Sequence, residues 1–154
     1  MDAQENVNMI DVGDKDDSHR IARAAGQITM SESTSRAIWK GELEKGNVIA
    51  VAKTAGIMGA KKTSHLLPLC HPLPISSVSV QIEKSEDPNG IEVFSEVKYS
   101  GKTGVEMEAL VACSTTLLTI YDMAKGEEKG MKINEIRLIE KQGGRSGHWR
   151  REDG

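Results

Sequence analysis

The segment from Gly101 to Gly126 constrains the fold of this 154-residue chain more than any other stretch. Thr103 and Glu106 have the spacing of a capping box, which predicts the N-terminus of a helix, and an apolar run follows them. Gly126 comes directly after Lys125 and predicts the C-terminal end. The sequence therefore predicts one long helix, around which the remaining elements have to be arranged.

Shorter elements are predicted on both sides of this helix. They are a strand over 19–30, a helix within 31–41 with its N-cap at Ser31 or Ser33, a helix over about 46–64 that ends before Pro68, strands over 75–82 and 91–99 joined by the turn SEDPNG, and a last strand over 131–141. Small residues in the helix over 46–64 allow a close approach to another helix. The order predicts an α+β fold, a ferredoxin-like sandwich with an antiparallel sheet and helices packed on one face.

Length and composition indicate a single domain over residues 19–154, which would be the catalytic domain if the chain is an enzyme. Hydrophobic residues make up 38%, charged residues 28% and the mean hydropathy is −0.41, which is typical of a globular protein. Residues 1–18 carry six acidic residues against one lysine, and we expect a solvated arm that can be disordered. The Gly- and Arg-rich tail, QGGRSGHWRREDG, is expected to be flexible. With no apolar run of roughly 20 residues and no secretory signal, the expected location is cytoplasmic.

Charge and cysteine usage exclude several kinds of partner. A net charge of −3 with 3% aromatic residues disfavours nucleic-acid binding, although Phe94 and Tyr99 could form an RNA-binding face on the sheet. The two cysteines, Cys70 and Cys113, show no zinc-site spacing, so we predict no metal site. A membrane partner is not expected either.

The motif GKTG at residues 101–104 has the form of a phosphate-binding loop. A Walker A motif requires glycine five positions before the Gly-Lys pair, where this chain has Glu96. An ATPase is therefore excluded. Two interpretations remain: an anion bound at the helix N-terminus, or a tight turn from strand to helix.

Prolines bracket Cys70 and His71 in the segment HLLPLCHPLP and predict a stiff, non-helical loop. Adjacent side chains of an extended segment point to opposite sides, which argues against a Cys-His nucleophilic pair. His71 is either a substrate donor or proton carrier, or a histidine satisfied by backbone groups.

Acidic residues occur at both ends of the long helix. Asp122 and Lys125 are three positions apart and form either an exposed salt bridge or, in a pocket, an acid–base pair. Glu106 and Glu108 could be simple partners of the helix dipole. Sixteen positions at roughly 1.5 Å each separate Glu106 from Asp122 by about 24 Å. Either the two ends have unrelated roles, or two chains pack with these helices antiparallel and assemble each site together.

Four segments carry a resemblance to a known family: LPLCHPL (67–73), GKTGVEMEAL (101–110), LTIYDMAK (118–125) and EKQGGRSG (140–147). The chain resembles, from about Met9 to its tail, the cyclic pyranopterin monophosphate synthases of molybdenum cofactor biosynthesis. The resemblance implies a lyase that converts 3′,8-cyclo-7,8-dihydroguanosine 5′-triphosphate to cyclic pyranopterin monophosphate and diphosphate. It implies no required cofactor, although magnesium could accompany the triphosphate.

The resemblance also implies a homohexamer, a trimer of dimers, with sites at the dimer interfaces. Asp122 and Lys125 would be the catalytic acid–base pair. The substrate would be bound by Leu69, Cys70, His71, Met107, Glu108, Glu106, Lys45, Lys61, Arg20 and Lys141. Arg23 and Lys62 remain alternatives to Arg20 and Lys61. A second class of function is a non-catalytic, oligomeric ferredoxin-like module that senses a nucleotide, and it would not need Asp122 beside Lys125.

Overall fold

The computed structural model describes residues 9–11, 13, 18–145 and 147–153, so the predicted acidic arm lies almost wholly outside the described residues. The elements are β1 (Ser18–Thr29), α1 (Glu32–Lys40), α2 (Val48–Lys61), α3 (Thr63–Leu66), β2 (Ser77–Glu86), β3 (Asn89–Gly101), α4 (Glu106–Ala124), β4 (Lys132–Gln142) and β5 (Trp149–Arg150). This is the predicted order, with the short elements α3 and β5 added.

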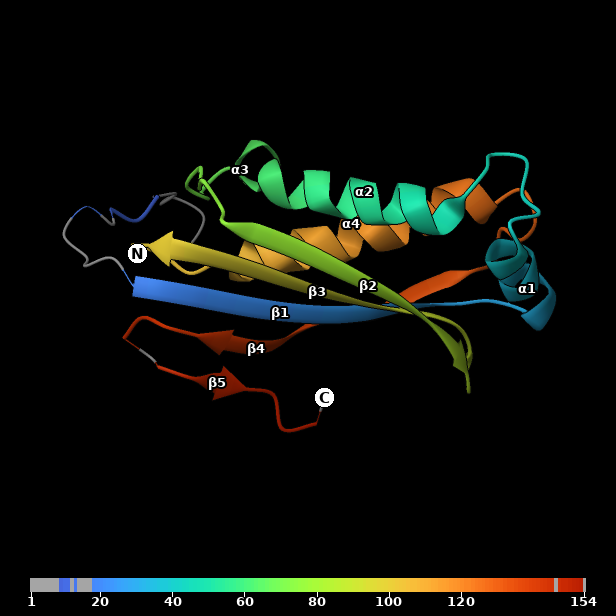
Figure 1. The fold of residues 1–154 in the computed structure, drawn as a ribbon. Coiled ribbons are helices and arrows are strands. Elements are labelled where there is room, and N and C mark those ends of the chain that lie inside the picture. The colour runs from blue at the N-terminus through green and yellow to red at the C-terminus, as the bar shows by residue number, and fades with distance from the viewer. Residues whose placement is uncertain (1–8, 12, 14–17, 146, 154) are drawn as a thin grey trace, which may run out of the picture.

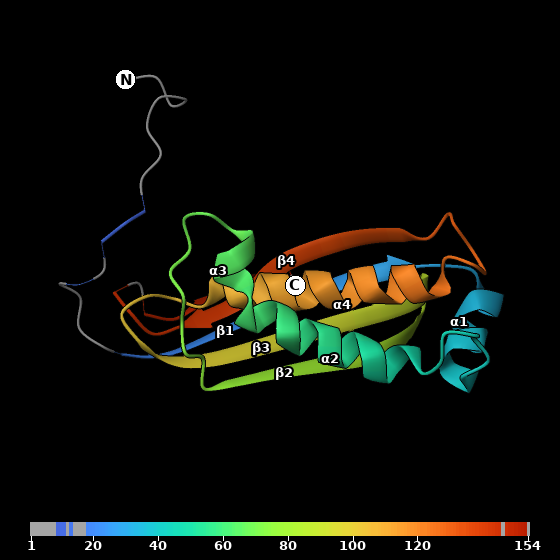
Figure 2. The same cartoon turned by 90° about the horizontal axis from the view of Figure 1, so that it is seen from above.

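The strands form one sheet in the order β2-β3-β1-β4-β5, and every neighbouring pair is antiparallel. Helices α2 and α4 lie side by side on one face of this sheet, while α1 sits at one end (Figures 1 and 2). The predicted fold class, an α+β architecture consistent with a ferredoxin-like sandwich, is confirmed. Within the described residues no helix is both long and apolar enough to cross a membrane.

Glycines let α4 approach both the sheet and α2. A Cβ atom at Gly26 of β1 would lie 2.7 Å from Cδ1 of Leu117, and one at Gly59 of α2 would lie 2.6 Å from Oγ1 of Thr115. Both distances are shorter than real Cβ contacts, so a larger residue at either position would displace side chains of α4. The predicted close helix approach is confirmed, and α4 is held at a fixed height over the sheet.

Helix ends follow the prediction at α1 but not at the start of α4. The Ser31 side chain accepts a hydrogen bond from Thr34 N, and Gly41 ends α1 in the left-handed conformation. Helix α4 begins at Glu106 itself, after a cap residue without a side-chain hydrogen bond, so the predicted capping box is wrong. The reason is that the Glu106 carboxylate pairs with Lys141 of β4 instead.

The C-terminal tail contains ordered structure where flexibility was expected. Strand β5 pairs with the end of β4, and the backbone N–H of Arg151 donates to Ile139 O at 2.9 Å. The Arg151 guanidinium donates to Leu138 O and lies over the Trp149 ring. These contacts fix the tail along the free edge of β4.

Candidate functional site

The predicted site residues fall into two groups at the two ends of α4. Because α2 and α4 run in opposite directions, the C-terminal end of α2 lies beside the N-terminal end of α4, together with the loop that follows α3 (Figure 2). This first end carries Arg20, Lys61, Leu69, Cys70, His71, Glu106, Met107, Glu108 and Lys141. The opposite end carries Lys45, Asp122 and Lys125.

Cations from two strands meet at the first end. Lys141 Nζ lies 2.6 Å from Glu106 Oε1, so β4 is joined to the first residue of α4. Arg20 of β1 donates from Nε to Gly101 O at 3.0 Å, and Gly143 and Gly144 pack closely against it. The two glycines leave no room for side chains beside this guanidinium, which accounts for the QGG segment after Lys141.

Arg20 and Arg23 lie on opposite faces of the sheet, because residues three apart on a strand point to opposite faces. Arg20 lies opposite Tyr99, which packs against the core on the helix side. Arg23 pairs instead with Glu96 and Glu140 on the face away from the helices. Arg20 therefore lies on the helix-facing side of the sheet, and Arg23 does not. Lys61 and Lys62 both lie at the end of α2, so the structure does not separate them.

Glu108 is the buried acid of the first end. Its residue is only 4% exposed, and this burial, with a smaller effect from the charge of Glu106, raises its pKa to about 6. Burial, and then the charge of Glu108, also raises the pKa of the Cys70 thiol. Glu108 can therefore exchange a proton near neutral pH, whereas Cys70 remains a thiol and lacks the thiolate that a nucleophile needs.

The loop after α3 presents Leu69, Cys70 and His71 beside α4. Leu69 and Met107 are exposed apolar side chains, and Cys70 and His71 are half-buried. The Cys70 N–H donates to Leu67 O at 3.1 Å, which closes a turn within this proline-rich segment. The predicted non-helical loop is confirmed from Leu67 onward, while His65 and Leu66 belong to α3.

The second end consists of an ion pair and a neighbouring loop lysine. Lys125 Nζ lies 3.0 Å from Asp122 Oδ1, and Lys45 Nζ donates to the Asp122 backbone oxygen at 3.0 Å. Lys125, and then Lys45, lowers the pKa of Asp122. Beside this pair is a hollow of about 310 Å³, lined by Glu42, Leu43, Glu44, Lys45, Met123, Gly126 and Glu127. In the single chain the Asp122 side chain is 62% exposed, so this end is open.

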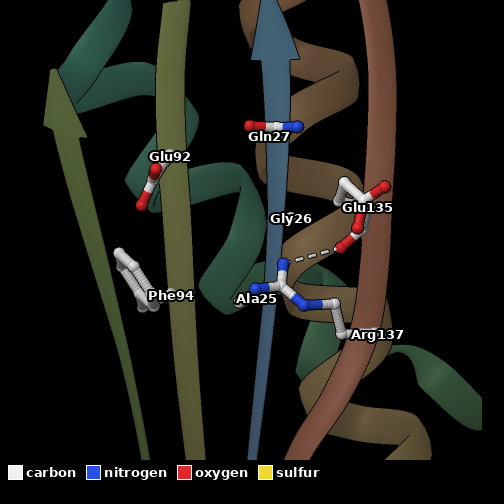
Figure 3. A pocket seen from close by; sticks show the side chains of 7 residues that line it. All are labelled: Ala25, Gly26, Gln27, Glu92, Phe94, Glu135 and Arg137. Atoms are coloured by element: carbon white, nitrogen blue, oxygen red, sulfur yellow. Dashed lines mark hydrogen bonds between the residues drawn. The ribbon is translucent and has the colours of Figure 1, made fainter. Parts of the chain in front are cut away.

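A further hollow lies on the opposite face of the sheet and contains none of the predicted site residues. It is lined by Ala25, Gly26, Gln27, Glu92, Phe94, Glu135 and Arg137 (Figure 3). The Arg137 guanidinium donates to Glu135 O, and Glu135 adopts a positive φ at an irregularity of β4. Phe94 points to this face while Tyr99 packs on the other, so the two rings do not form the shared platform that RNA binding would need.

No group of three or more potential metal ligands occurs among the histidine, cysteine and acidic residues that the structure describes. Residues 102–105 form a bent connection from the end of β3 to α4, and Lys102 Nζ donates to Gly13 O. Sequence reasoning missed one cluster altogether: Glu140 receives hydrogen bonds from Arg23, Gln142 and His148 on the outer face of the sheet. Only the repeated occurrence of basic residues in the tail could have pointed to it.

The fold and the site together define an α+β sandwich that gathers cations and carboxylates at both ends of one long helix. A sequence model described as the MoaC family matches residues 9–144, and the chain belongs to this family. The resemblance noted in the sequence is confirmed.

Three relatives illustrate the match, and each is named cyclic pyranopterin monophosphate synthase. The protein of Thermomicrobium roseum is 46% identical over 153 residues, covering 99% of this chain and 92% of the relative. The protein of Brucella ovis is 52% identical over 143 residues, covering 93% and 87%. That of Dinoroseobacter shibae is 50% identical over 151 residues, covering 98% and 96%. The chain thus belongs to a family of enzymes.

Proposed function

We propose that this chain is a cyclic pyranopterin monophosphate synthase, which rearranges 3′,8-cyclo-7,8-dihydroguanosine 5′-triphosphate to cyclic pyranopterin monophosphate and releases diphosphate. The reaction makes it a lyase of the phosphorus–oxygen type within molybdenum cofactor biosynthesis. The relatives named above support the activity, and the distribution of charged residues supports the substrate class. The cytoplasmic location expected from the sequence is part of this proposal.

The observation that carries the proposal is the separation of the two groups along α4. The helix has 19 residues, and Glu106 and Asp122 stand about 24 Å apart at a rise of roughly 1.5 Å per residue. A triphosphate nucleoside cannot contact both ends of one chain at once. Two chains with antiparallel α4 helices would bring the first end of one against the second end of the other.

An exposed stripe on α4 fits such a pairing. Met107, Ser114, Leu118 and Lys125 recur at intervals of seven or four positions, and Leu118 is 60% exposed. A two-fold axis near Ser114 would set Met107 of one copy beside Asp122 of the other. Apolar side chains of α2, Val51 and Met58, are also exposed on this side and would extend the interface. Three such dimers would form the expected hexamer.

Each group has a chemical role in this assembly. Lys141, Lys61, Arg20 and Lys45 would neutralise the phosphates and stabilise diphosphate as it leaves. Glu106 and Glu108 would accept the N–H donors of the guanine-derived ring, with Leu69, Cys70, His71 and Met107 lining the substrate. Asp122 and Lys125 would transfer protons. The conversion conserves oxidation state, so no redox cofactor is required, and magnesium could accompany the triphosphate.

The test is to incubate the purified protein with the cyclic triphosphate and to measure diphosphate and the pterin product. A synthase releases both in equal amounts. The sensing module binds the nucleotide without releasing diphosphate, and that result would overturn the proposal. Sedimentation of the same sample tests the hexamer, because a fully active monomer would contradict the shared site.

A further inference from the structure

An extra residue in β4 determines which face of the sheet Lys141 occupies. Ile139 of β4 has no partner on β1. The residues on either side of it are paired: Leu138 with Ala24, Glu140 with Arg23, and Lys141 with Ala22. This is the pattern of a β-bulge, in which two residues of one strand oppose one of the other.

The bulge reverses the side-chain alternation of the strand beyond it. Strand β4 carries a second one-residue shift against β1, between Ala25 and Gln27. If that shift stayed and only the bulge at Ile139 were removed, Lys141 would lie opposite Ile21 and point away from the helices. With the bulge it lies opposite Ala22, a core residue on the helix-facing side, and its amine reaches Glu106 at 2.6 Å. The position of this cation at the first end of α4 therefore depends on the bulge.

Glu140 follows the bulge directly and is bonded by three other side chains. It is only 8% exposed, and its carboxylate receives Nη1 of Arg23, Nε2 of His148 at 2.6 Å and Nε2 of Gln142 at 3.4 Å. His148, Arg23 and Gln142 lower its pKa to about 2, so the carboxylate is ionised at neutral pH. Slipping the strand by one residue would move this charge into the apolar core opposite Ala22, at a high desolvation cost.

We propose that Glu140, clamped by Arg23 and by His148 of the C-terminal tail, is a positioning residue that aims Lys141 into the substrate site. The inference rests on the proposed function, because it assumes that Lys141 contacts the substrate. It also gives the tail a role: His148 lies beyond residue 144, where the match to the family model ends. Strand β5 then serves to deliver this histidine to β4.

A double-mutant cycle tests the proposal in the full-length protein. Glu140→Gln, Lys141→Ala and the double variant are compared by kcat and KM for diphosphate release from the cyclic triphosphate. Glu140→Gln should lower kcat/KM about tenfold, mainly through KM, because it displaces a binding group. In the Lys141→Ala background it should lower kcat/KM less than about twofold further. Losses that multiply independently would overturn the proposal.

Glu96→Gln is the matched control, since it also removes one carboxylate from Arg23 but lies on β3, away from the bulge. We expect a similar fall in thermal midpoint with nearly unchanged kcat/KM. An equal loss of kcat/KM in this control would reduce Glu140 to a general stability residue and overturn the proposal. If Lys141→Ala itself retains full activity, the assignment of Lys141 to the substrate site fails first. If Lys141→Ala is impaired but the cycle is additive, only the positioning role fails.

Discussion

The two ends of α4 differ in how completely one chain builds them. At the N-terminal end, Glu108 is buried in the first turn of the helix, its charge acts on Cys70 of the neighbouring loop, and Glu106 is paired with Lys141 at the end of β4. At the C-terminal end, Asp122 and Lys125 are at least half exposed, and Lys45 lies beside them. The first end is already shaped in the single chain, whereas the second resembles an ordinary surface ion pair, which contributes little to stability. Its chemistry depends on what covers it.

The pKa values of the acidic groups at the two ends are also shifted in opposite directions. A helix N-terminus favours a negative charge, yet the pKa of Glu108 rises to about 6, so burial outweighs the backbone N–H groups there. Asp122 lies near the C-terminus, where the dipole disfavours it, yet Lys125 lowers its pKa. Near neutral pH the two acids therefore differ in charge state: the pKa of Glu108 leaves part of this group protonated, whereas the lowered pKa of Asp122 keeps it a carboxylate beside Lys125.

The largest effect should follow from removing the exposed pair. Asp122→Ala and Lys125→Ala should each lower product formation by about a thousandfold or more, because general acid–base groups contribute on the order of 10²–10⁴. The oligomer should remain intact, as judged by size-exclusion chromatography. Arg36→Ala is the matched control, since Arg36 and Glu32 form an exposed ion pair of similar geometry on α1. Wild-type turnover in both site variants would identify the pair as a simple salt bridge.

Mixing two inactive variants tests whether the two ends meet between chains. Glu108→Ala and Asp122→Ala, combined in equal amounts and allowed to exchange subunits, should recover about one quarter of the wild-type sites, since half of the dimers are hybrids with one intact site each. The measurement is diphosphate release before and after exchange. Proven exchange without recovery would contradict a shared site and leave the two ends unrelated.

Local signals predicted most of the fold, while long-range pairing decided the details of the site. Ser31 and Gly41 bound α1 as expected, because capping depends on nearby backbone groups. The capping box at Glu106 failed because Lys141, far along the chain, takes that carboxylate. The Glu140 cluster was missed for the same reason, since it requires the register of β1 and β4. Spacing alone did predict that Glu106 and Asp122 lie near opposite ends of one helix.

Replacing the buried acid should stabilise the protein while lowering its activity. The pKa of Glu108 is about 6 in the folded chain against an ordinary value of 4.5, so the folded state binds the proton more tightly and loses stability as pH rises through this window. At pH 8, Glu108→Gln should therefore increase the free energy of unfolding by up to about 2 kcal/mol. At pH 4 the difference should vanish. Glu106→Gln is the control and should not stabilise, because it breaks the ion pair with Lys141.

The smallest effect on activity is expected from replacing Cys70. This variant tests whether the N-terminal end of α4 takes part in chemistry or only binds substrate. If proton transfer belongs to Asp122 and Lys125, the first end only binds substrate, and its thiol performs no covalent step. Burial raises the pKa of Cys70, so Cys70→Ser should lower kcat/KM by less than about fivefold, far below the loss of a nucleophile. Iodoacetamide at neutral pH should also modify Cys70 more slowly than free cysteine. A hundredfold loss in Cys70→Ser would instead place covalent chemistry at the N-terminal end and reverse the division of roles.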